Sequence, residues 1–359
     1  MPHAKEPEFT PDQYPAFPDG FRTVELETIS LTKLLIDQDA AEQDRVFEAC
    51  KGRGFFYLDL AGSEPGDTIV KGANRIAAVA DDVFKLPLEE KLQYRLGTGS
   101  SSLDGYKRVG ESYADKSGTP DTAEFFNVGK NDMIVPDDQM GGSWPEVIMS
   151  AKPLFKEYIV AAHTIGMAIV QILATKLGVD PSEFASRHRI GELSGDHVRL
   201  TRGPPRDKEE LPEIQTPSHT DFGTITLLMN WLGGLQVWSE SARKAELLNH
   251  EPDTPGEWQW VRPKGGCAII NLGDAAVKFT NGVLCAGRHR VIPAPGVQGK
   301  YPRYSVVYFV RPENKCIMKQ LRGRGIPDGP EETVDIEAGD WIQRQAAGLG
   351  IRFQDRVKG

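Results

Sequence analysis

Residues 216–238 read TPSHTDFGTITLLMNWLGGLQVW and place two potential metal ligands, His219 and Asp221, directly before an apolar run. The run is rich in residues that favour strands, and side chains two apart on an extended chain point to the same face. One imidazole and one carboxylate on one face can begin a metal site. The same pair can also form an ordinary polar turn at the entrance of a strand. The pair alone leaves both interpretations open.

The choice between these interpretations depends on a further histidine in another strand. His289 lies in NLGDAAVKFTNGVLCAGRHRV (271–291), where a turn at TNG is followed by a strand-like segment. It stands 68 residues beyond Asp221, which leaves room for several intervening strands. His197, at the start of another strand-like run, is a weaker competitor. Two histidines and a carboxylate on one face of an ion form the site of non-haem Fe(II) oxygenases, although such ligands also bind zinc.

An arginine and a serine share one face of a later apolar strand. In YPRYSVVYFV (301–310), Arg303 and Ser305 are two residues apart. A buried guanidinium is costly unless an anion meets it, and its planar fork matches a carboxylate. A metal site together with a carboxylate anchor suggests a ligand that chelates the metal at one end and carries an acid group at the other. A 2-oxo diacid has this shape.

Short strand-like runs separated by Gly, Pro, Asn and Asp occupy the chain from His197 to Val310, which predicts a sandwich or barrel such as a double-sheet jelly roll. These runs are HVRLTR, TITLLMNW, LQVW, WQWV, CAIINL, HRVI and YSVVYFV. The first half is mainly helical: we expect strands at 23–31 and 54–60, helices at 40–52, 67–94, about 144–177 and after Asp180, and an irregular loop at 95–142. A last helix is predicted at 338–350.

Composition argues against several classes of protein. The 359 residues are 39% apolar and carry a formal net charge of −9 without a block of Lys and Arg, so nucleic acid and anionic membranes are poor expectations as partners. No signal peptide is visible, and we expect no apolar run long enough to cross a bilayer. The four cysteines are far apart and form no CxxC pair, which favours reduced thiols and a cytoplasmic protein.

Three motifs in the same order resemble those of the 2-oxoglutarate/Fe(II)-dependent dioxygenases. They are SHTDFGTITLLMNWLGGLQVW (218–238), NLGDAAVKFTNGVLCAGRHRV (271–291) and RYS (303–305). The branch that they resemble contains isopenicillin N synthase, the plant flavonoid and gibberellin oxygenases, and fungal relatives. The segments VFEACKGRGFFYLDLAG, FKLPLEEKLQY and GYKRVGESYADKSGTPDTAEFF are similar to the leader region of that branch, so the resemblance spans roughly residues 20–350.

The resemblance implies roles for particular residues. His219, Asp221 and His289 are the expected iron ligands, and Arg303 and Ser305 the expected binders of the distal carboxylate of 2-oxoglutarate. The chain departs from the pattern at TRGPP (201–205), where plant members read NYYPP. The family tyrosine that helps to hold 2-oxoglutarate is absent, with Arg202 or Gly203 near its place. Arg202 is therefore an additional expected contact for 2-oxoglutarate.

The same resemblance implies a mainly β fold with a helical N-terminal half, in which a double-stranded β-helix, or jelly roll, is flanked by helices. The expected segments are a tail (1–20), a leader domain (21–142), a helical support (143–190), the oxygenase domain (191–330), and a C-terminal helix and tail (331–359). The implied requirements are Fe(II), 2-oxoglutarate and O2, with ascorbate as a possible support. We expect the loop at 98–118 and the helix around Asp340 to shape the substrate pocket.

The expected activity is oxidation of a small molecule by hydroxylation, desaturation or ring closure, with release of succinate and CO2, in specialised metabolism. One alternative is an Fe(II) oxidase of the isopenicillin N synthase type, in which Arg303 and Ser305 would bind the substrate instead of 2-oxoglutarate. A zinc hydrolase is a further alternative, but the sequence has no HExxH helix. The last alternative is a non-enzymatic jelly-roll binding protein. The sequence leaves the substrate and the oligomeric state open.

Overall fold

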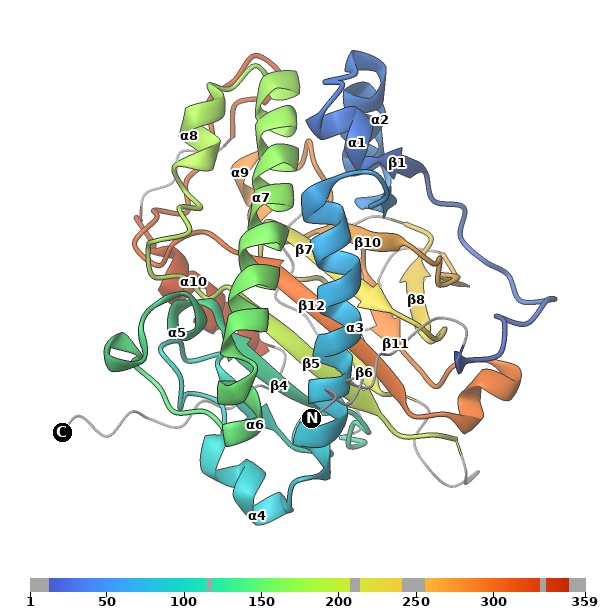
Figure 1. Cartoon of the computed structure of the whole chain (residues 1–359). Coiled ribbons are helices and arrows are strands. Elements are labelled where there is room, and N and C mark those ends of the chain that lie inside the picture. The colour runs from blue at the N-terminus through green and yellow to red at the C-terminus, as the bar shows by residue number, and fades with distance from the viewer. Residues whose placement is uncertain (1–12, 115–117, 207–213, 241–255, 330–333, 349–359) are drawn as a thin grey trace.

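The computed structural model describes residues 13–114, 118–206, 214–240, 256–329 and 334–348. These residues form three layers: long helices, an eight-stranded sheet in the order β1-β2-β10-β7-β12-β5-β4-β3, and a four-stranded sheet in the order β6-β11-β8-β9 (Figure 1). The strands are β1 (Thr28–Ser30), β2 (Phe55–Asp59), β3 (Gly105–Lys107), β4 (Glu124–Gly129), β5 (His197–Gly203), β6 (Thr216–His219), β7 (Ile225–Asn230), β8 (Leu235–Trp238), β9 (Trp258–Trp260), β10 (Cys267–Leu272), β11 (His289–Val291) and β12 (Arg303–Val310). The helices are α1 (Leu31–Leu35), α2 (Ala40–Gly52), α3 (Glu64–Lys85), α4 (Leu88–Lys91), α5 (Lys130–Ile134), α6 (Glu146–Ser150), α7 (Lys152–Leu177), α8 (Pro181–Ala185), α9 (Asp274–Phe279) and α10 (Ala338–Gly348).

The central strand β12 is buried along its whole length, and its two faces serve different layers. On one face, Val306 and Tyr308 belong to the hydrophobic core that joins the sheet to α3 and α7. On the other face, Val307 and Phe309 belong to a smaller apolar cluster between the two sheets. This period-two alternation is the ordinary geometry of a strand buried on both sides. It places every second residue from Arg303 onward in the space between the sheets.

The predicted double-sheet core is confirmed, since each strand-like run from His197 onward forms a strand. The loop predicted at 95–142 is wrong, because β3, β4 and α5 lie within it. Its Gly-, Ser- and Asp-rich composition favours a loop locally, but β4 pairs along its length with β5, and β3 pairs with β4. The helix predicted at 67–94 is interrupted at Leu86. This residue precedes Pro87 and takes an extended conformation.

Helix α7 corrects a second expectation, namely that no apolar segment is long enough to cross a bilayer. By length and composition it is long and apolar enough, although 67% of its most apolar window is buried inside the protein. The helix lies across the large sheet beside α3 (Figure 1). The predicted helix at 144–177 is also divided, because α6 ends at Ser150 and α7 starts at Lys152. We interpret α7 as the central core helix of this fold.

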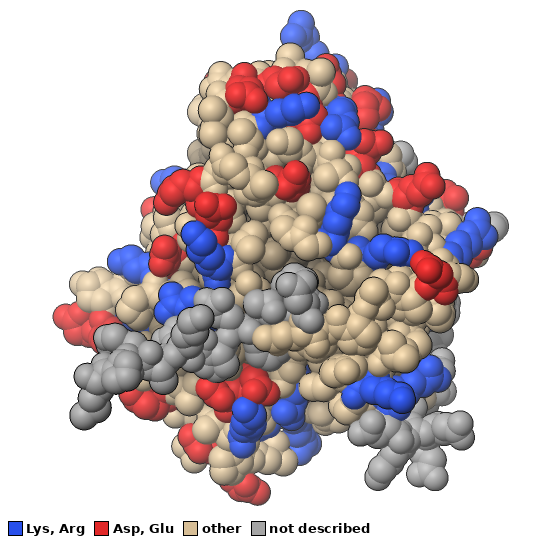
Figure 2. Space-filling model, turned by 45° about the vertical axis from the view of Figure 1, so that its right-hand side comes forward, with Lys and Arg blue, Asp and Glu red and all other residues tan. Residues whose placement is uncertain are grey.

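The segment 21–142 is continuous with the rest of the fold, because it supplies strands to both edges of the large sheet. Strands β1 and β2 extend one edge through β10, and β3 and β4 extend the other through β5. The cavity between the sheets is therefore bordered by N-terminal strands on both sides. On the face of the molecule shown in Figure 2, basic and acidic side chains are interspersed, without a broad area of one sign among the described residues.

Candidate metal centre

The three sequence-predicted metal ligands meet at one end of the small sheet. His219 ends β6 and His289 begins the neighbouring strand β11, and the two residues are direct register partners. Asp221 follows β6 by two residues. Its Oδ1 atom lies 3.7 Å from Nε2 of His219 and 4.0 Å from Nε2 of His289. All three side chains are buried. Among the described residues, these three form the one group of His, Cys, Asp and Glu side chains that could hold a metal ion.

Backbone carbonyls orient both imidazoles. The Nδ1 atom of His219 lies 2.8 Å from the Pro217 carbonyl oxygen, and Nδ1 of His289 lies 3.1 Å from that of Gly287. A carbonyl oxygen only accepts hydrogen bonds, so each Nδ1 carries a proton and each Nε2 is the nitrogen left to bind a metal. Burial, together with the nearby His289, lowers the pKa of His219 to about 3, which keeps this ring neutral. Neutral Nε2 atoms held in this way are ready to bind a metal.

The two oxygens of Asp221 have different surroundings. Oδ2 accepts hydrogen bonds from Thr226 Oγ1 at 2.7 Å and from Asn271 Nδ2 at 2.6 Å. Oδ1 faces the two histidines. Burial opposes ionisation, but His289, His219 and the two hydrogen bonds outweigh it and lower the pKa of this carboxyl group. The carboxylate is thus held by one oxygen and offers the other to a metal.

This donor set fits Fe(II). Two neutral imidazole nitrogens and one carboxylate oxygen are the ligands of a facial triad, which leaves the other positions of the ion open for a cosubstrate and O2. Small side-chain rotations would bring these atoms, 3.7 and 4.0 Å apart, onto one ion with bonds of about 2 Å. The ligands are also positioned by second contacts from Thr226, Asn271 and backbone carbonyls, as established metal sites require.

Arg303 lines the same cavity as the triad and is 3% exposed. Its Nε donates a hydrogen bond to the Gly233 carbonyl oxygen at 2.8 Å. Within the described part of the chain, no carboxylate pairs with this guanidinium, and burial alone lowers its pKa to about 10. It remains a cation at neutral pH. A buried cation with unused terminal N–H groups needs an anion from outside the protein.

Ser305 follows on the same face of β12, is buried, and also lines this cavity. Thr226, Asn271, Leu228 and Val307 line the same cavity. The sequence expectation that Arg303 and Ser305 share a face with access to the metal ligands agrees with this placement. A hydroxyl and a guanidinium side by side can form a cradle for one carboxylate.

Arg202 is misassigned by the sequence pattern. Its register partner is Tyr304, so its side chain lies on the helix-covered face of the sheet rather than in the cavity. There it forms an ion pair with Glu124, and its guanidinium carbon stands 5.4 Å from the centre of the Phe84 ring of α3. It therefore cannot contact 2-oxoglutarate in this arrangement.

Gln215 occupies the space beside Gly203, near the expected place of the family tyrosine. A Cβ atom added at Gly203 would lie 2.2 Å from Oε1 of Gln215, so the glutamine side chain occupies the space beside this residue. Gln215 is buried and donates a hydrogen bond to the Pro204 carbonyl oxygen at 3.2 Å. Gly203 is the register partner of Arg303. An amide therefore fills the space that a larger side chain at position 203 would need.

Sequence reasoning missed the residues that hold the ligands in place. Thr226 and Asn271 are polar residues within the mainly apolar runs TITLLMN and CAIINL, and this irregularity was the available signal. The competitor His197 is buried elsewhere, with Nδ1 on the Gly195 carbonyl oxygen. Of the expected pocket segments, the loop at 98–118 contributes Ser112 to a second cavity beside the triad. Helix α10 lines neither cavity in its described part.

Comparisons with known proteins agree with the geometry. Residues 26–147 match the family described as "non-haem dioxygenase in morphine synthesis N-terminal", and residues 194–312 match the 2OG-Fe(II) oxygenase superfamily. A 2-oxoglutarate-dependent dioxygenase of Aspergillus fumigatus is 31% identical over 350 residues, covering 92% of this chain and 88% of the relative. Another, from Dothideomycetidae sp., is 28% identical over 316 residues, covering 87% and 90% of the two chains.

The fold has solved counterparts as well. A full-length Neurospora crassa protein, solved in complex with alpha-KG and 5-formyluracil, has a TM-score of 0.69 and 23% sequence identity, covering 93% of this chain and 99% of the other. This likeness confirms the predicted jelly-roll core with its helical N-terminal region. The A. fumigatus relative and the two matched segments establish the family: this chain belongs to the 2-oxoglutarate- and Fe(II)-dependent oxygenases.

Proposed function

We propose that this oxygenase holds Fe(II) with His219, Asp221 and His289 and binds the distal carboxylate of 2-oxoglutarate with Arg303 and Ser305, in order to oxidise a small molecule. One observation carries this assignment. The triad and a buried guanidinium without an acidic partner among the described residues line a single cavity. A 2-oxo diacid that binds the metal through its oxo acid end has its other carboxylate available for Arg303.

The protein groups bind and orient the reactants. When bound, the iron and 2-oxoglutarate supply the oxidising chemistry, in which O2 is consumed and succinate and CO2 are released. The carbonyl contacts of both histidines fix their Nε2 atoms toward the ion, and the contacts of Thr226 and Asn271 leave one oxygen of Asp221 as the ligand. Apolar side chains, among them Leu228 and Val307, line part of the cavity and limit water there.

The family assignment supports a 2-oxoglutarate-dependent reaction over the alternative of an oxidase without this cosubstrate. In that alternative Arg303 would bind the substrate, and turnover would proceed when 2-oxoglutarate is omitted. Coupled release of succinate separates the two cases directly. Several of the similar chains are fungal 2-oxoglutarate-dependent dioxygenases, which supports a place in secondary metabolism. Hydroxylation, desaturation and ring closure are all within the reach of this chemistry.

The assignment of Arg303 is tested by anaerobic titration of the Fe(II) protein with 2-oxoglutarate, followed through the absorption band of the iron–2-oxoglutarate complex. Arg303→Gln should raise the Kd for 2-oxoglutarate about 10–100-fold, because a charge-assisted pair is lost. Arg202→Gln is the matched control on the neighbouring strand, since its side chain points to the other face of the sheet. The Kd of the Arg202→Gln variant for 2-oxoglutarate should stay unchanged. An unchanged Kd in Arg303→Gln would overturn the assignment.

A further inference from the structure

A second cavity adjoins the triad and contains cationic and aromatic side chains. His219 and Asp221 line both this cavity and the one that holds Arg303, whereas Arg303 and Ser305 line only the latter. The second cavity therefore reaches the proposed iron site from a direction that Arg303 and Ser305 do not line. Arg311, Phe125, Phe222 and Asp121 line only this second cavity, whereas Arg199 and Phe309 line both and stand at the boundary between the two.

Arg199 projects from β5 into the space between the sheets. Its guanidinium carbon lies 4.2 Å from the centre of the Phe125 ring and 4.9 Å from that of Phe309, so two aromatic rings hold the group. Its Nε donates a hydrogen bond to Asn127 Oδ1 at 2.8 Å. Within the described residues, no hydrogen bond or ion pair engages its terminal nitrogens, and neither terminal nitrogen is among the enclosed polar atoms. They are open to the cavity.

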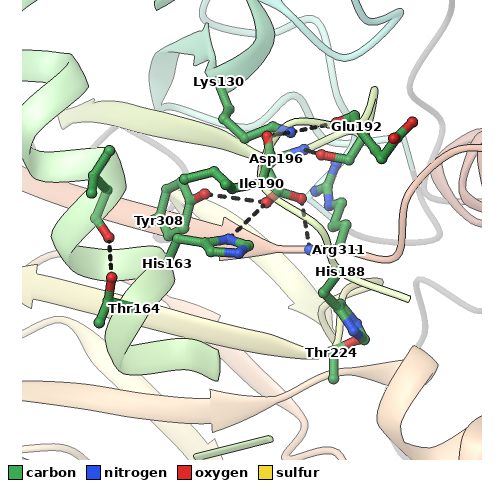
Figure 3. A network of polar contacts seen from close by, with 12 residues as sticks. Lys130, His163, Thr164, His188, Ile190, Glu192, Asp196, Thr224, Tyr308 and Arg311 are labelled. Atoms are coloured by element: carbon green, nitrogen blue, oxygen red, sulfur yellow. Dashed lines mark hydrogen bonds and ion pairs between the residues drawn. The ribbon is translucent and has the colours of Figure 1, made fainter. Parts of the chain in front are cut away.

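Arg311 adds a second fixed cation to the same wall. It is 2% exposed, its guanidinium carbon lies 5.2 Å from the Phe309 ring centre, and its Nη1 donates to the Gly195 carbonyl oxygen at 3.1 Å. Its backbone is held by buried Asp196, whose Oδ1 accepts from the Arg311 amide at 2.8 Å while Oδ2 accepts from Tyr308. Figure 3 shows Arg311, Tyr308 and His163 converging on this carboxylate. The network fixes the position of the strand end that carries Arg311.

The charges facing this cavity do not cancel. Asp121 forms a buried ion pair with Lys107 and accepts from the amides of Gly110 and Ser112, so its charge is already compensated. Asp221 is the proposed iron ligand and is compensated by the metal. Burial lowers the pKa of Arg199 to about 9 and that of Arg311 to about 10, which leaves both protonated at neutral pH. Buried Asp196 lies behind Arg311 and offsets part of its charge, so the charge of Arg199 is the one that remains for a ligand, with Arg311 beside it.

We infer that the substrate of this oxygenase is a carboxylic acid with a compact apolar body, whose carboxylate is bound by Arg199 beside Arg311 and whose carbon skeleton lies against the phenyl rings. The inference rests on the function proposed above, because it places the substrate next to the iron triad. Two guanidinium sites then separate the two acids: Arg303 binds the cosubstrate and Arg199 the substrate. Phe222 and Phe309 exclude water from the remaining surface of the ligand.

The probes for this inference are matched pairs of carboxylic acids and their primary amides on phenyl, indolyl and cyclohexyl frames. They are titrated anaerobically into the protein loaded with Fe(II) and saturating 2-oxoglutarate. Binding is followed by calorimetry and by the change that a nearby substrate causes in the iron–2-oxoglutarate absorption band. At least one acid should bind about tenfold or more tightly than its amide, since an amide lacks the charge.

Variants assign the preference to Arg199. Arg199→Gln should abolish the preference for the acid and leave the Kd for 2-oxoglutarate unchanged, whereas Arg199→Lys should retain part of it because the charge remains. Arg187→Gln is the matched control, since that guanidinium stacks on Phe279 at 4.6 Å but lines neither cavity. Circular dichroism verifies that each variant is folded.

Several outcomes would overturn the inference. In the native protein, these are the failure of every acid in the panel to bind and equal binding of acids and amides. In Arg199→Gln, they are a surviving preference for the acid, and a weaker Kd for 2-oxoglutarate without loss of acid binding. The last outcome would show that Arg199 binds the cosubstrate. If the native protein forms no iron–2-oxoglutarate band at all, the proposed function itself fails. A normal band without acid preference refutes only the substrate class.

Discussion

The two faces of the large sheet carry similar polar side chains in different circumstances. On the face covered by α3, Arg202 pairs with Glu124, Lys91 binds the same carboxylate, and Tyr304 donates to Asp81 at 2.6 Å. On the face toward the small sheet lie Arg199 of β5 and Arg303 of the adjacent strand β12. Each makes one hydrogen bond through Nε and has no acidic partner within the described chain.

The difference separates stability from function. The polar groups named on the helix-covered face satisfy one another, as buried groups must when no ligand reaches them. The arginines between the sheets keep hydrogen-bond donors without partners, which lowers stability. A bound acid can offset this loss by accepting hydrogen bonds from them. We therefore expect substitutions on the helix face to change the free energy of unfolding, and substitutions on the cavity face to change binding and turnover.

The largest effect should come from removing a metal ligand. Asp221→Ala leaves two neutral histidines, which hold Fe(II) poorly, so iron binding should be lost and turnover should fall about a thousandfold or more. Iron content after anaerobic reconstitution and succinate release measure both effects. Asp81→Ala, an aspartate on the helix face, is the control and should keep its iron. Full activity in Asp221→Ala would refute the site assignment.

The second effect concerns the paired charges of the helix face. Glu124 is buried, and its carboxylate accepts from Lys91 at 2.9 Å and from Tyr106 at 2.6 Å as well as from Arg202. Glu124→Ala should lower the free energy of unfolding by about 3 kcal/mol, because a buried lysine loses its partner. Urea denaturation measures this loss. The Kd for 2-oxoglutarate should stay near that of the native protein, and a parallel loss of affinity would break the distinction between the faces.

A smaller effect is expected from a side chain that only positions a ligand. Asn271→Ala removes one of the two hydrogen bonds to Oδ2 of Asp221, so iron affinity should fall about 10–100-fold while the three ligands remain. Competition with a chelator measures the change. Asn230→Ala is the matched control, since Asn230 donates to the Leu232 carbonyl oxygen and does not contact the triad. Equal affinities in the two variants would contradict a positioning role for Asn271.

The sequence sufficed to propose the ligands but not to place every neighbour. His219 with Asp221 and Arg303 with Ser305 could be singled out as candidates because their residue types and period-two spacing mark one face of a strand, and His289 could be added from its strand-like context. Arg202 could not be placed in the same way. Its face depends on the register of β5 against β12, where it lies opposite Tyr304, and register between strands about a hundred residues apart is not a local property.

The missed strands have a similar cause. Residues 105–107 and 124–129 lie in a stretch whose composition favours turns, and their strand conformation comes from pairing with β5 and with each other. The substrate cavity depends on that pairing, because Phe125 and Asn127 of β4 are the register partners of Thr201 and Arg199. The aromatic support and the hydrogen-bond partner of Arg199 were therefore invisible to local sequence patterns. The end of α3 before Pro87, by contrast, could be read locally from the proline. The prediction of one helix over 67–94 followed the helical periodicity and passed over this proline.

The smallest effect should come from the hydrogen bond between Tyr304 and Asp81 on the helix face. Tyr304→Phe should lower the free energy of unfolding by about 0.5–1 kcal/mol at neutral pH, since Asp81 is only partly buried. Burial opposes ionisation of Asp81, but hydrogen bonds from Lys85 and Tyr304 outweigh it and lower the pKa below 3.8. A lowered pKa means that this stabilisation is present above pH 3.8 and is lost as the pH falls through the folded-state value. The difference between native and variant protein in urea titrations should accordingly shrink as the pH falls below 3.8. A difference that grows on acidification would show that Tyr304 stabilises the protonated carboxyl group instead.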